Sequence, residues 1–448
     1  MKSSGLMIAA VVLAVLSGIL YWSGHRKPTD PTVSAASDEA PKILTLNAGD
    51  ISKVEIDKQG ALNVVVGKDA TGKWQITGPQ VLSADQQSVS SLVSALSPLT
   101  SDRLVEDQAG DLQQYGLKSP ALEVKATTKD GQSHRLLVGD ATPSGNAAFA
   151  MLAGDPRVFT IANYTKSSVD KSPNDLRDTR LFTLDFDKLN RVELTSKNST
   201  IEFTRNRDAW QILKPQPLRT DSSQVDELVR QLRDAKMDLA ASSDERKIAS
   251  AFASATAVAT AKLTDSSTVQ NLAVRKDKDG YLAQSGAVNG IYKISNQLGE
   301  ELAKSLDDFR NKKLFDFGFD EPEKLELRDA GKSYLFTKGG QDWWLNGKKM
   351  DSAAVQALID KLRELNSSKF PNSGFGASSI DLTVTSDAGK RVEHVLISKA
   401  GDQYLAKREN QPTLYQLDAN SVTNVEKAAA DVNAVEAAQP AQTPAPKK

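Results

Sequence analysis

Three stretches of the chain share one order of apolar and polar positions. Each opens with a basic–apolar–Glu–apolar run, passes a turn into a second β-rich run, and then reaches a Trp-x-Ile or Trp-x-Leu pattern. Alternation of this kind predicts strands with one buried face. The opening runs lie at 53–56, 191–194 and 324–327, and the tryptophans are Trp74, Trp210 and Trp343.

A helix is predicted after each of these tryptophans. Asp85, Asp221 and Asp351 mark the starts, where an Asp side chain accepts free backbone N–H groups and complements the helix dipole. Four apolar positions follow each Asp at the same offsets, which form the i, i+3, i+4, i+7 stripe of an amphipathic helix. The four positions are Val89/Val225/Val355, Leu92/Leu228/Leu358, Val93/Val229/Ile359 and Leu96/Leu232/Leu362.

The recurrence of these offsets predicts three tandem copies of one unit. The second half of each copy is again β-rich, as at 122–127 and 134–138 in the first copy. We therefore predict an α+β fold, with three repeats of antiparallel hairpins and meanders that each carry amphipathic helices. The expected repeats are 43–185, 186–317 and 318–432, and each sheet is expected to have one covered and one wet face.

The two ends of the chain have a different composition. An uncharged stretch, 3–24, follows Lys2, and a helix over 6–22 would span roughly 25 Å, slightly less than a bilayer core. We predict an uncleaved single transmembrane helix within 1–27, while a cleaved signal peptide is the alternative. A flexible tether, 28–42, and a disordered Ala/Pro tail, 433–448, complete the prediction.

A long folded segment after the first membrane span is translocated largely regardless of its local charge. This predicts a single-pass protein of the bacterial inner membrane whose bulk lies in the periplasm or outside the cell. The 448 residues include 56 Lys+Arg against 57 Asp+Glu, a net charge of −1, and no long basic block. That balance argues against nucleic acid as a partner. Cysteine is absent, which excludes disulfides and thiolate metal sites.

Candidate chemistry is sparse. Ser168 and Lys171 match the Ser-x-x-Lys pattern of penicillin-binding proteins, but neither a Ser-Asp-Asn nor a Lys-Thr-Gly partner is present. His134 and His394 fall in equivalent predicted strands, yet two lone histidines without clustered carboxylates are typical of outward strand positions. We therefore predict no catalytic, cofactor-binding or metal-binding residues, and no enzyme.

Other repeated or paired residues have structural interpretations. Glu55, Glu193 and Glu326 alternate with apolar neighbours, which indicates a solvent-facing position. The repeated tryptophans are expected in the cores. Trp344 differs, because a strand turns its side chain to the face opposite Trp343. It is our candidate interaction residue, for a sugar or a protein partner.

Two further motifs carry a family resemblance. Residues 136–145 contain Gly139-Asp140-Ala141-Thr142-Pro143-Ser144-Gly145, and residues 175–182 read Asp-Leu-Arg-Asp-Thr-Arg-Leu-Phe. The second motif has a counterpart at 308–315, while the third copy lacks it. The turn with Gly139, Asp140, Pro143 and Gly145 resembles the Gly-Asp-x-x-Pro-x-Gly turn of domain-of-unknown-function family 4340, and the resemblance extends over 43–432. Copies two and three lack this turn.

The resemblance implies a membrane-anchored bacterial envelope protein without catalytic residues. Such proteins are often encoded beside ABC-type export components and gliding-motility-type auxiliary proteins. We therefore expect a non-enzymatic extracytoplasmic scaffold or accessory of such a complex, with membrane attachment through the N-terminal segment. The alternative is a module that binds cell-wall glycan or another envelope polymer.

Overall fold

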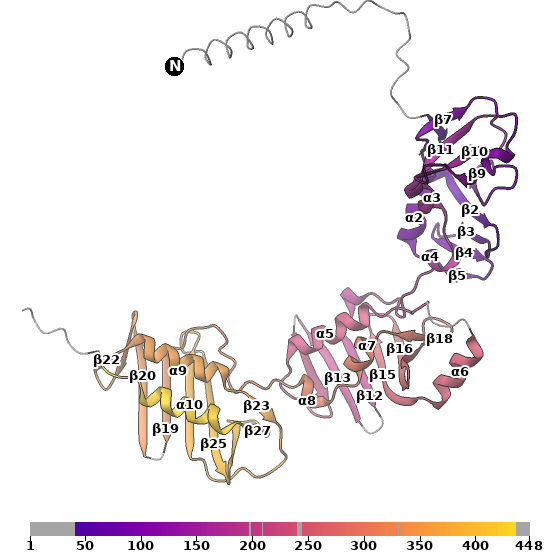
Figure 1. Cartoon of the computed structure of the whole chain (residues 1–448). Coiled ribbons are helices and arrows are strands. Elements are labelled where there is room, and N and C mark those ends of the chain that lie inside the picture. Colours follow the sequence, from indigo (N-terminus) through magenta and orange to yellow (C-terminus); the bar gives the residue numbers. More distant parts are fainter. Residues whose placement is uncertain (1–40, 197–198, 208, 240–243, 330, 436–448) are drawn as a thin grey trace, which may run out of the picture. The chain divides into compact units, whose positions relative to one another are not determined.

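The computed structural model describes residues 41–435, except 197–198, 208, 240–243 and 330 (Figure 1). The chain divides into two compact units, Met1–Asp178 and Thr179–Lys448. The first unit contains one large sheet and the second unit contains two, and every strand pair in them is antiparallel.

The first unit contains a nine-stranded sheet in the order β5-β4-β3-β2-β8-β9-β10-β11-β7, with β1 and β6 paired beside it. Short helices cover one of its faces. The strands are β1 Lys42–Leu44, β2 Ile51–Lys58, β3 Val64–Lys68, β4 Trp74–Gly78, β5 Leu82–Ser83, β6 Leu99–Thr100, β7 Arg103–Glu106, β8 Leu122–Thr128, β9 Ser133–Ala141, β10 Ala147–Leu152 and β11 Val158–Ala162. The helices are η1 Ala48–Asp50, α2 Gln86–Ala95, η2 Gln113–Tyr115, α3 Asn163–Val169 and α4 Pro173–Leu176.

The second unit begins with a seven-stranded sheet in the order β14-β13-β12-β15-β16-β17-β18. The strands are β12 Arg191–Ser196, β13 Ser199–Asn206, β14 Ala209–Lys214, β15 Thr256–Thr264, β16 Val269–Asp277, β17 Gly280–Ser285 and β18 Ile291–Ile294. The helices are η3 Phe186–Lys188, α5 Ser222–Arg233, α6 Glu245–Ser254, α7 Asn296–Leu302 and α8 Leu306–Phe309.

The third sheet has nine strands in the order β22-β21-β20-β19-β24-β25-β26-β27-β23. Helices α9 and α10 lie side by side on one face of this sheet (Figure 1). The strands are β19 Lys324–Asp329, β20 Lys332–Gly339, β21 Asp342–Leu345, β22 Lys348–Met350, β23 Ser367–Lys369, β24 Ile380–Ser386, β25 Arg391–Ala400, β26 Gln403–Arg408 and β27 Leu414–Leu417. The helices are α9 Ser352–Glu364 and α10 Ala419–Ala430.

The predicted α+β class is wrong. The described residues form mostly antiparallel sheet, and their helices are few and short, with none longer than the 13 residues of α9. Strands such as β8 and β24 alternate buried and half-buried positions along their whole length, so most of the apolar pattern belongs to sheets. The predicted amphipathic helix after each tryptophan is present, but it packs on one face of a far larger sheet.

The predicted transmembrane helix, within 1–27, lies outside the described residues. Within the ranges that the structure describes, no helix is both long and apolar enough to cross a bilayer.

The three large sheets repeat one core order of strands. Strands β4-β3-β2-β8-β9-β10-β11 correspond to β14-β13-β12-β15-β16-β17-β18 and to β21-β20-β19-β24-β25-β26-β27. In each sheet, a helix follows the outer strands and is capped by Asp85, Asp221 or Asp351, as the sequence predicts. Trp74, Trp210 and Trp343 are buried beneath these helices or beside them. The described residues therefore show repeat-like β structure.

Short backbone segments connect consecutive sheets. The segment that enters each sheet, which we call its leading segment, pairs with the residues that follow the capped helix. The segment that leaves each sheet, its closing segment, pairs with the residues that precede that helix. The N–H groups of Asp85, Asp221 and Asp351 donate to the carbonyls of Leu176, Phe309 and Asn433 at 2.8, 2.9 and 2.9 Å. The leading segments are 42–44, 179–181 and 312–314, and the closing segments are 176–178, 309–311 and 433–435.

The third sheet is thus closed without the Asp-Leu-Arg-Asp motif. Residues 433–435, which the sequence places in the tail, bridge to Met350 and accept from the Asp351 N–H. Val432 beside them is buried in the third core. Because this closure uses backbone groups, it needs no particular side chains and leaves no sequence motif.

The last strands of the first and second sheets carry buried residues on both faces. Four consecutive residues of β11, from Val158 to Ile161, are buried, which alternation alone would not produce. The connection between α2 and β8 crosses the far face and buries Leu117 and Met151 there. In the second sheet, Phe252 of α6 and Leu282 are the buried residues on that face. The expectation of one wet face therefore fails for these last strands.

Candidate functional site

The family turn packs against a neighbouring turn of the first unit. Gly139 and Asp140 belong to β9, and a Cβ atom on Gly139 would stand 2.1 Å from the Tyr115 carbonyl oxygen. Gly116 is in the left-handed region with φ 66°, and a Cβ there would lie 2.6 Å from the Asp140 carboxyl. Glycine is needed at both positions for close approach of the two backbones. The Gly-Asp pair is therefore structural.

The rest of the motif forms the loop between β9 and β10. The Gly145 N–H donates to the Thr142 carbonyl at 2.8 Å, and the Asn163 side chain donates to the Gly145 carbonyl at 2.9 Å. Gly145 has φ 76°, which a residue with a side chain adopts at a cost. Pro143 lines an open hollow of about 400 Å³ beside Asp102 and Arg103.

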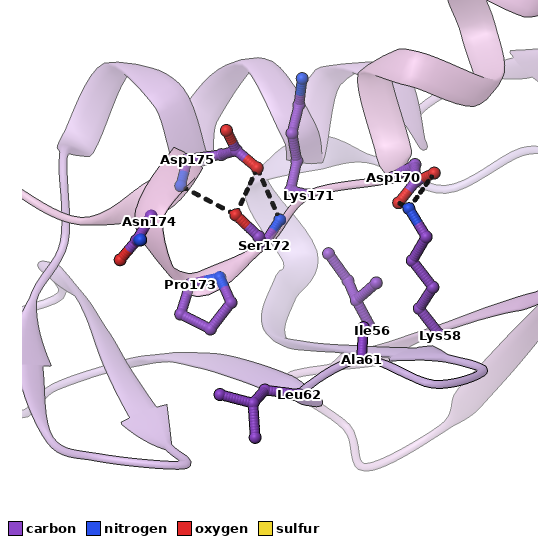
Figure 2. A pocket seen from close by; sticks show the side chains of 10 residues that line it. All are labelled: Ile56, Lys58, Ala61, Leu62, Asp170, Lys171, Ser172, Pro173, Asn174 and Asp175. Carbon is purple, nitrogen blue, oxygen red and sulfur yellow. Dashed lines mark hydrogen bonds and ion pairs between the residues drawn. The ribbon is translucent and has the colours of Figure 1, made fainter. Parts of the chain in front are cut away.

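A hollow of about 390 Å³ opens at the end of the β2–β3 hairpin (Figure 2). Its apolar side consists of Ile56, Ala61, Leu62 and Pro173, and Leu62 is 71% exposed. The rest of the lining comes from Lys58, from α4 and from the loop that precedes it.

Two pairs of polar groups around this hollow bind each other. The Lys58 ammonium contacts both oxygens of Asp170 at 2.8 and 2.9 Å, and it joins the hairpin to the α3–α4 loop. Burial opposes ionisation of Asp175, but hydrogen bonds from the Ser172 hydroxyl and N–H outweigh it and lower the pKa of the carboxyl. Together Ser172 and Asp175 form the capping box of α4.

The Ser-x-x-Lys residues do not form a catalytic pair. The Ser168 hydroxyl donates to the Tyr164 carbonyl at 2.8 Å, within α3. Ser168 is not among the residues that line the hollow, whereas Lys171 is. Figure 2 shows the Lys171 side chain extending away from Leu62. A nucleophile requires a base within hydrogen-bond reach, and Lys171 does not meet Ser168 in that way.

A similar hollow of about 240 Å³ lies at the equivalent place in the second sheet. Leu194 stands where Ile56 stands, and the Lys171-Ser172 pair is matched by Lys304-Ser305. Ser305 and Asp308 form the capping box of α8. Lys304, however, is bound to Gln224 and Glu301 at 3.0 and 2.8 Å.

The outward glutamates form a repeated cluster of ion pairs. Burial opposes ionisation of Glu55, but Lys125 and Lys53 outweigh it and lower the pKa of its carboxyl. Each glutamate lies between basic groups, on the outward face of the first half of its sheet. The pairs are Glu55 with Lys53 and Lys125 at 3.1 and 3.0 Å, Glu193 with Arg191 and Lys262 at 3.1 and 3.2 Å, and Glu326 with Lys324 and Arg328 at 2.6 and 3.9 Å.

Trp344 lies on the outward face of the third sheet, opposite Thr337 and Lys349, and is 38% exposed. A Cβ on Gly339 would stand 3.1 Å from the indole nitrogen, so the ring packs over that glycine. Lys349 is itself paired with Asp342 at 2.9 Å. Trp344 thus offers part of an aromatic surface with a charged pair beside it.

The two histidines occupy equivalent strands but opposite faces. His134 is opposite Ala126, in phase with buried Leu136 and Val138, while His394 is opposite Thr383 on the outward face. His394 contacts Glu409 at 3.3 Å. Among the described residues, no group of three His, Asp or Glu side chains could hold a metal ion.

Residues that sequence reasoning missed stand at the register position of His134. Gln270 and Glu393 point inward, and their side chains accept from the Thr183 and Asp316 N–H groups at 2.9 and 2.6 Å. They fix the loops that follow the leading segments. The sequence could have indicated these two residues, because each is a polar residue at a position of its strand where the alternation is otherwise apolar.

Comparison with known proteins settles the family. The model of the domain of unknown function DUF4340 matches residues 74–251 and 210–381, two overlapping segments that together span more than half of the chain. The chain belongs to the DUF4340 family. The resemblance first suggested by the turn at 139–145 is thereby confirmed. No curated protein and no solved structure matches the chain.

The two DUF4340 matches begin at the equivalent tryptophans, Trp74 and Trp210, and each runs into the following repeat. Their offset reflects the repeated strand order of the sheets. The family description assigns no activity, so the function must be argued from the surfaces described above.

Proposed function

We propose that this DUF4340 protein is a non-enzymatic scaffold or accessory of the bacterial cell envelope. In this proposal the apolar N-terminal stretch, 3–24, holds the chain at the inner membrane, and the sheets lie outside the cytoplasm. The partner class suggested by the family resemblance is ABC-type transport or gliding-motility-like machinery.

The observation that carries the proposal is the repeated ion-pair cluster on the outward faces. Glu55, Glu193 and Glu326 occupy equivalent positions of the three sheets, each between basic side chains. The glutamate side chains are 14–30% exposed and their basic partners 37–67%. Ion pairs that solvent reaches in this way contribute little to stability, typically below about 1 kcal/mol. Charged surfaces of this kind instead give orientation and specificity to association with a partner of complementary charge.

Affinity capture after crosslinking in native cells tests the proposal. The tagged full-length protein is expected to retain subunits of an envelope transport complex. The triple variant Glu55→Lys, Glu193→Lys, Glu326→Lys should lose them. Its control carries Glu245→Lys, Glu300→Lys and Glu364→Lys at exposed helix positions and should retain them. Repeated capture without any envelope complex would contradict the scaffold.

Glycan binding is the second candidate, and the half-exposed Trp344 favours it. An indole ring offers an apolar face for sugar stacking, and the Lys349–Asp342 pair beside it supplies polar groups. Titration with purified cell-wall sacculi should change the tryptophan fluorescence. The Trp344→Ala variant should abolish that change while the fold, followed by circular dichroism, is retained. An unchanged spectrum of the original protein would exclude this candidate.

A further inference from the structure

Within the second unit, Arg219 reaches from the second sheet to the third. It lies just before α5, and its side chain is only 17% exposed. One guanidinium nitrogen donates to the Lys313 carbonyl at 2.7 Å and to the Tyr415 hydroxyl at 3.0 Å. The other pairs with Asp316. Tyr415 belongs to β27 and is 1% exposed, so the contact enters the third core.

Arg408 approaches the same aspartate from the third sheet. Its side chain is 13% exposed, donates to the Leu314 carbonyl at 2.7 Å, and stands 3.2 Å from the second oxygen of Asp316. It also pairs with the buried Glu393 at 3.1 Å. Asp316 is therefore held between two arginines, one from each sheet.

The closing segment adds a second contact in the same region. The Arg310 guanidinium lies 3.5 Å from the ring centroid of Phe370 and donates to Thr413 at 3.4 Å. Phe370 in turn packs on Tyr415, with ring centroids 5.4 Å apart. Arg219 and Arg310 thus converge on neighbouring side chains of the third sheet.

The chemistry of this cluster favours one fixed geometry. An arginine fork that binds a carboxylate and carbonyls holds its partners in direction as well as distance. Both arginines are largely buried, whereas Asp316 is 42% exposed. Loss of Asp316 therefore leaves the Arg219 charge desolvated and without its carboxylate partner.

We propose that Arg219, Asp316 and Arg408 form a latch that locks the second and third sheets into one rigid body. Release of the latch frees residues 309–316 to act as a hinge. In this state the two sheets keep their own folds but lose their fixed separation. This inference is independent of the proposed function, because it concerns the distance between two parts of the chain.

Distance distributions from pulsed electron paramagnetic resonance test the latch in the full chain. The absence of native cysteine allows two spin labels to be placed cleanly, at Val269→Cys and Val392→Cys, both more than half exposed. With the latch intact, the expected distribution is narrow. Arg219→Gln and, separately, Asp316→Asn should each broaden it at least about twofold, since each removes the shared pairing.

Arg230→Gln is the matched control, because Arg230 pairs with Glu227 within α5 and should leave the width unchanged. Circular dichroism checks that each variant is folded. If one latch variant does not fold, the other still provides the test. A distribution that is already broad in the original chain would overturn the latch. Equal widths for the original chain and both latch variants would overturn it as well.

Discussion

Two glutamates, buried Glu202 and half-buried Glu426, have opposite consequences for stability. Glu202 lies on β13 and is 6% exposed, between Lys214 at 2.6 Å and Arg191 at 3.0 Å. A hydrogen bond from Lys214, opposed by burial and aided by the charge of Arg191, lowers the pKa of Glu202. For Glu426 on α10, burial together with the charge of Asp329 outweighs the charges of Lys399 and Lys332 and raises the pKa.

Glu202→Gln should destabilise the second unit by about 1–3 kcal/mol at pH 7, because two cations lose a charged acceptor. A carboxyl with a lowered folded pKa stabilises above its unfolded pKa, and that stabilisation disappears as pH falls through the folded value. Chemical unfolding at pH 7 and at pH 3 measures the difference, which should shrink in acid. Glu364→Gln, at an exposed helical position, is the control and should change little.

Glu426→Gln should have the opposite effect and raise the unfolding temperature at pH 7. A raised folded pKa means that ionisation costs more in the folded chain, so stability is lost as pH rises from the unfolded pKa through the folded one. The neutral amide removes that cost. Thermal unfolding at pH 7 and pH 4 provides the measurement, and the gain should vanish at the lower pH. A loss of stability at pH 7 would contradict the assignment.

At the scale of elements, glycine contacts decide how the first sheet is covered. The β9 backbone at Gly139 meets the Tyr115 carbonyl so closely that no side chain fits, which brings the 112–117 turn onto the far face. The second and third sheets are covered there by other connections, α6 and the residues around Gly374. This accounts for the absence of the Gly-Asp turn from copies two and three.

Gly139→Ala should therefore destabilise the first unit by about 1–3 kcal/mol, the usual cost of forcing a methyl group into a packed contact. Gly110→Ala is a suitable control, because its Cβ would meet nothing within 4 Å and its φ is not left-handed. Chemical unfolding followed by circular dichroism compares the two variants. Equal stability of both would show that the 112–117 turn moves aside freely.

The closing segments are the second feature at this scale. A chain that ends at Asp431 lacks buried Val432 and the backbone pairing of 433–435 with 349–351. We expect it to unfold at a lower temperature than a chain that ends at Val435, with a loss of roughly 2 kcal/mol from one buried Val side chain. Differential scanning calorimetry measures both chains. Identical transitions would mean that the third sheet closes without this segment.

At the scale of the whole molecule, each compact unit has its own hydrophobic core or cores. Ile51 is fully buried in the core of the first unit, and Phe203 is fully buried in the second unit. The absence of cysteine means that these apolar cores hold the chain without disulfides.

Separate cores predict separate unfolding transitions. Ile51→Ala should shift only the transition of the first unit, and Phe203→Ala only that of the second, each by about 2–5 kcal/mol. Calorimetry of the full chain resolves the two events, and hydrogen exchange assigns them to their residues. A single transition that moves with both substitutions would contradict this division.

Local patterns in the sequence determined much of the repeated architecture. The caps at Asp85, Asp221 and Asp351, the stripes behind them and the buried tryptophans follow from residues close together in the chain, whose periodicity reports a buried face. The same patterns overstated the helices, because alternation in short strands is a weaker signal than a helical stripe.

Tertiary structure alone decided what covers each face and what joins the sheets. The closing role of 433–435 uses backbone groups, which carry no residue signature. The opposite orientations of His134 and His394 depend on a register shift of one residue, which turns a side chain to the other face. The convergence of Arg219, Asp316 and Arg408 joins residues far apart in the chain, and such contacts arise only once the sheets are built.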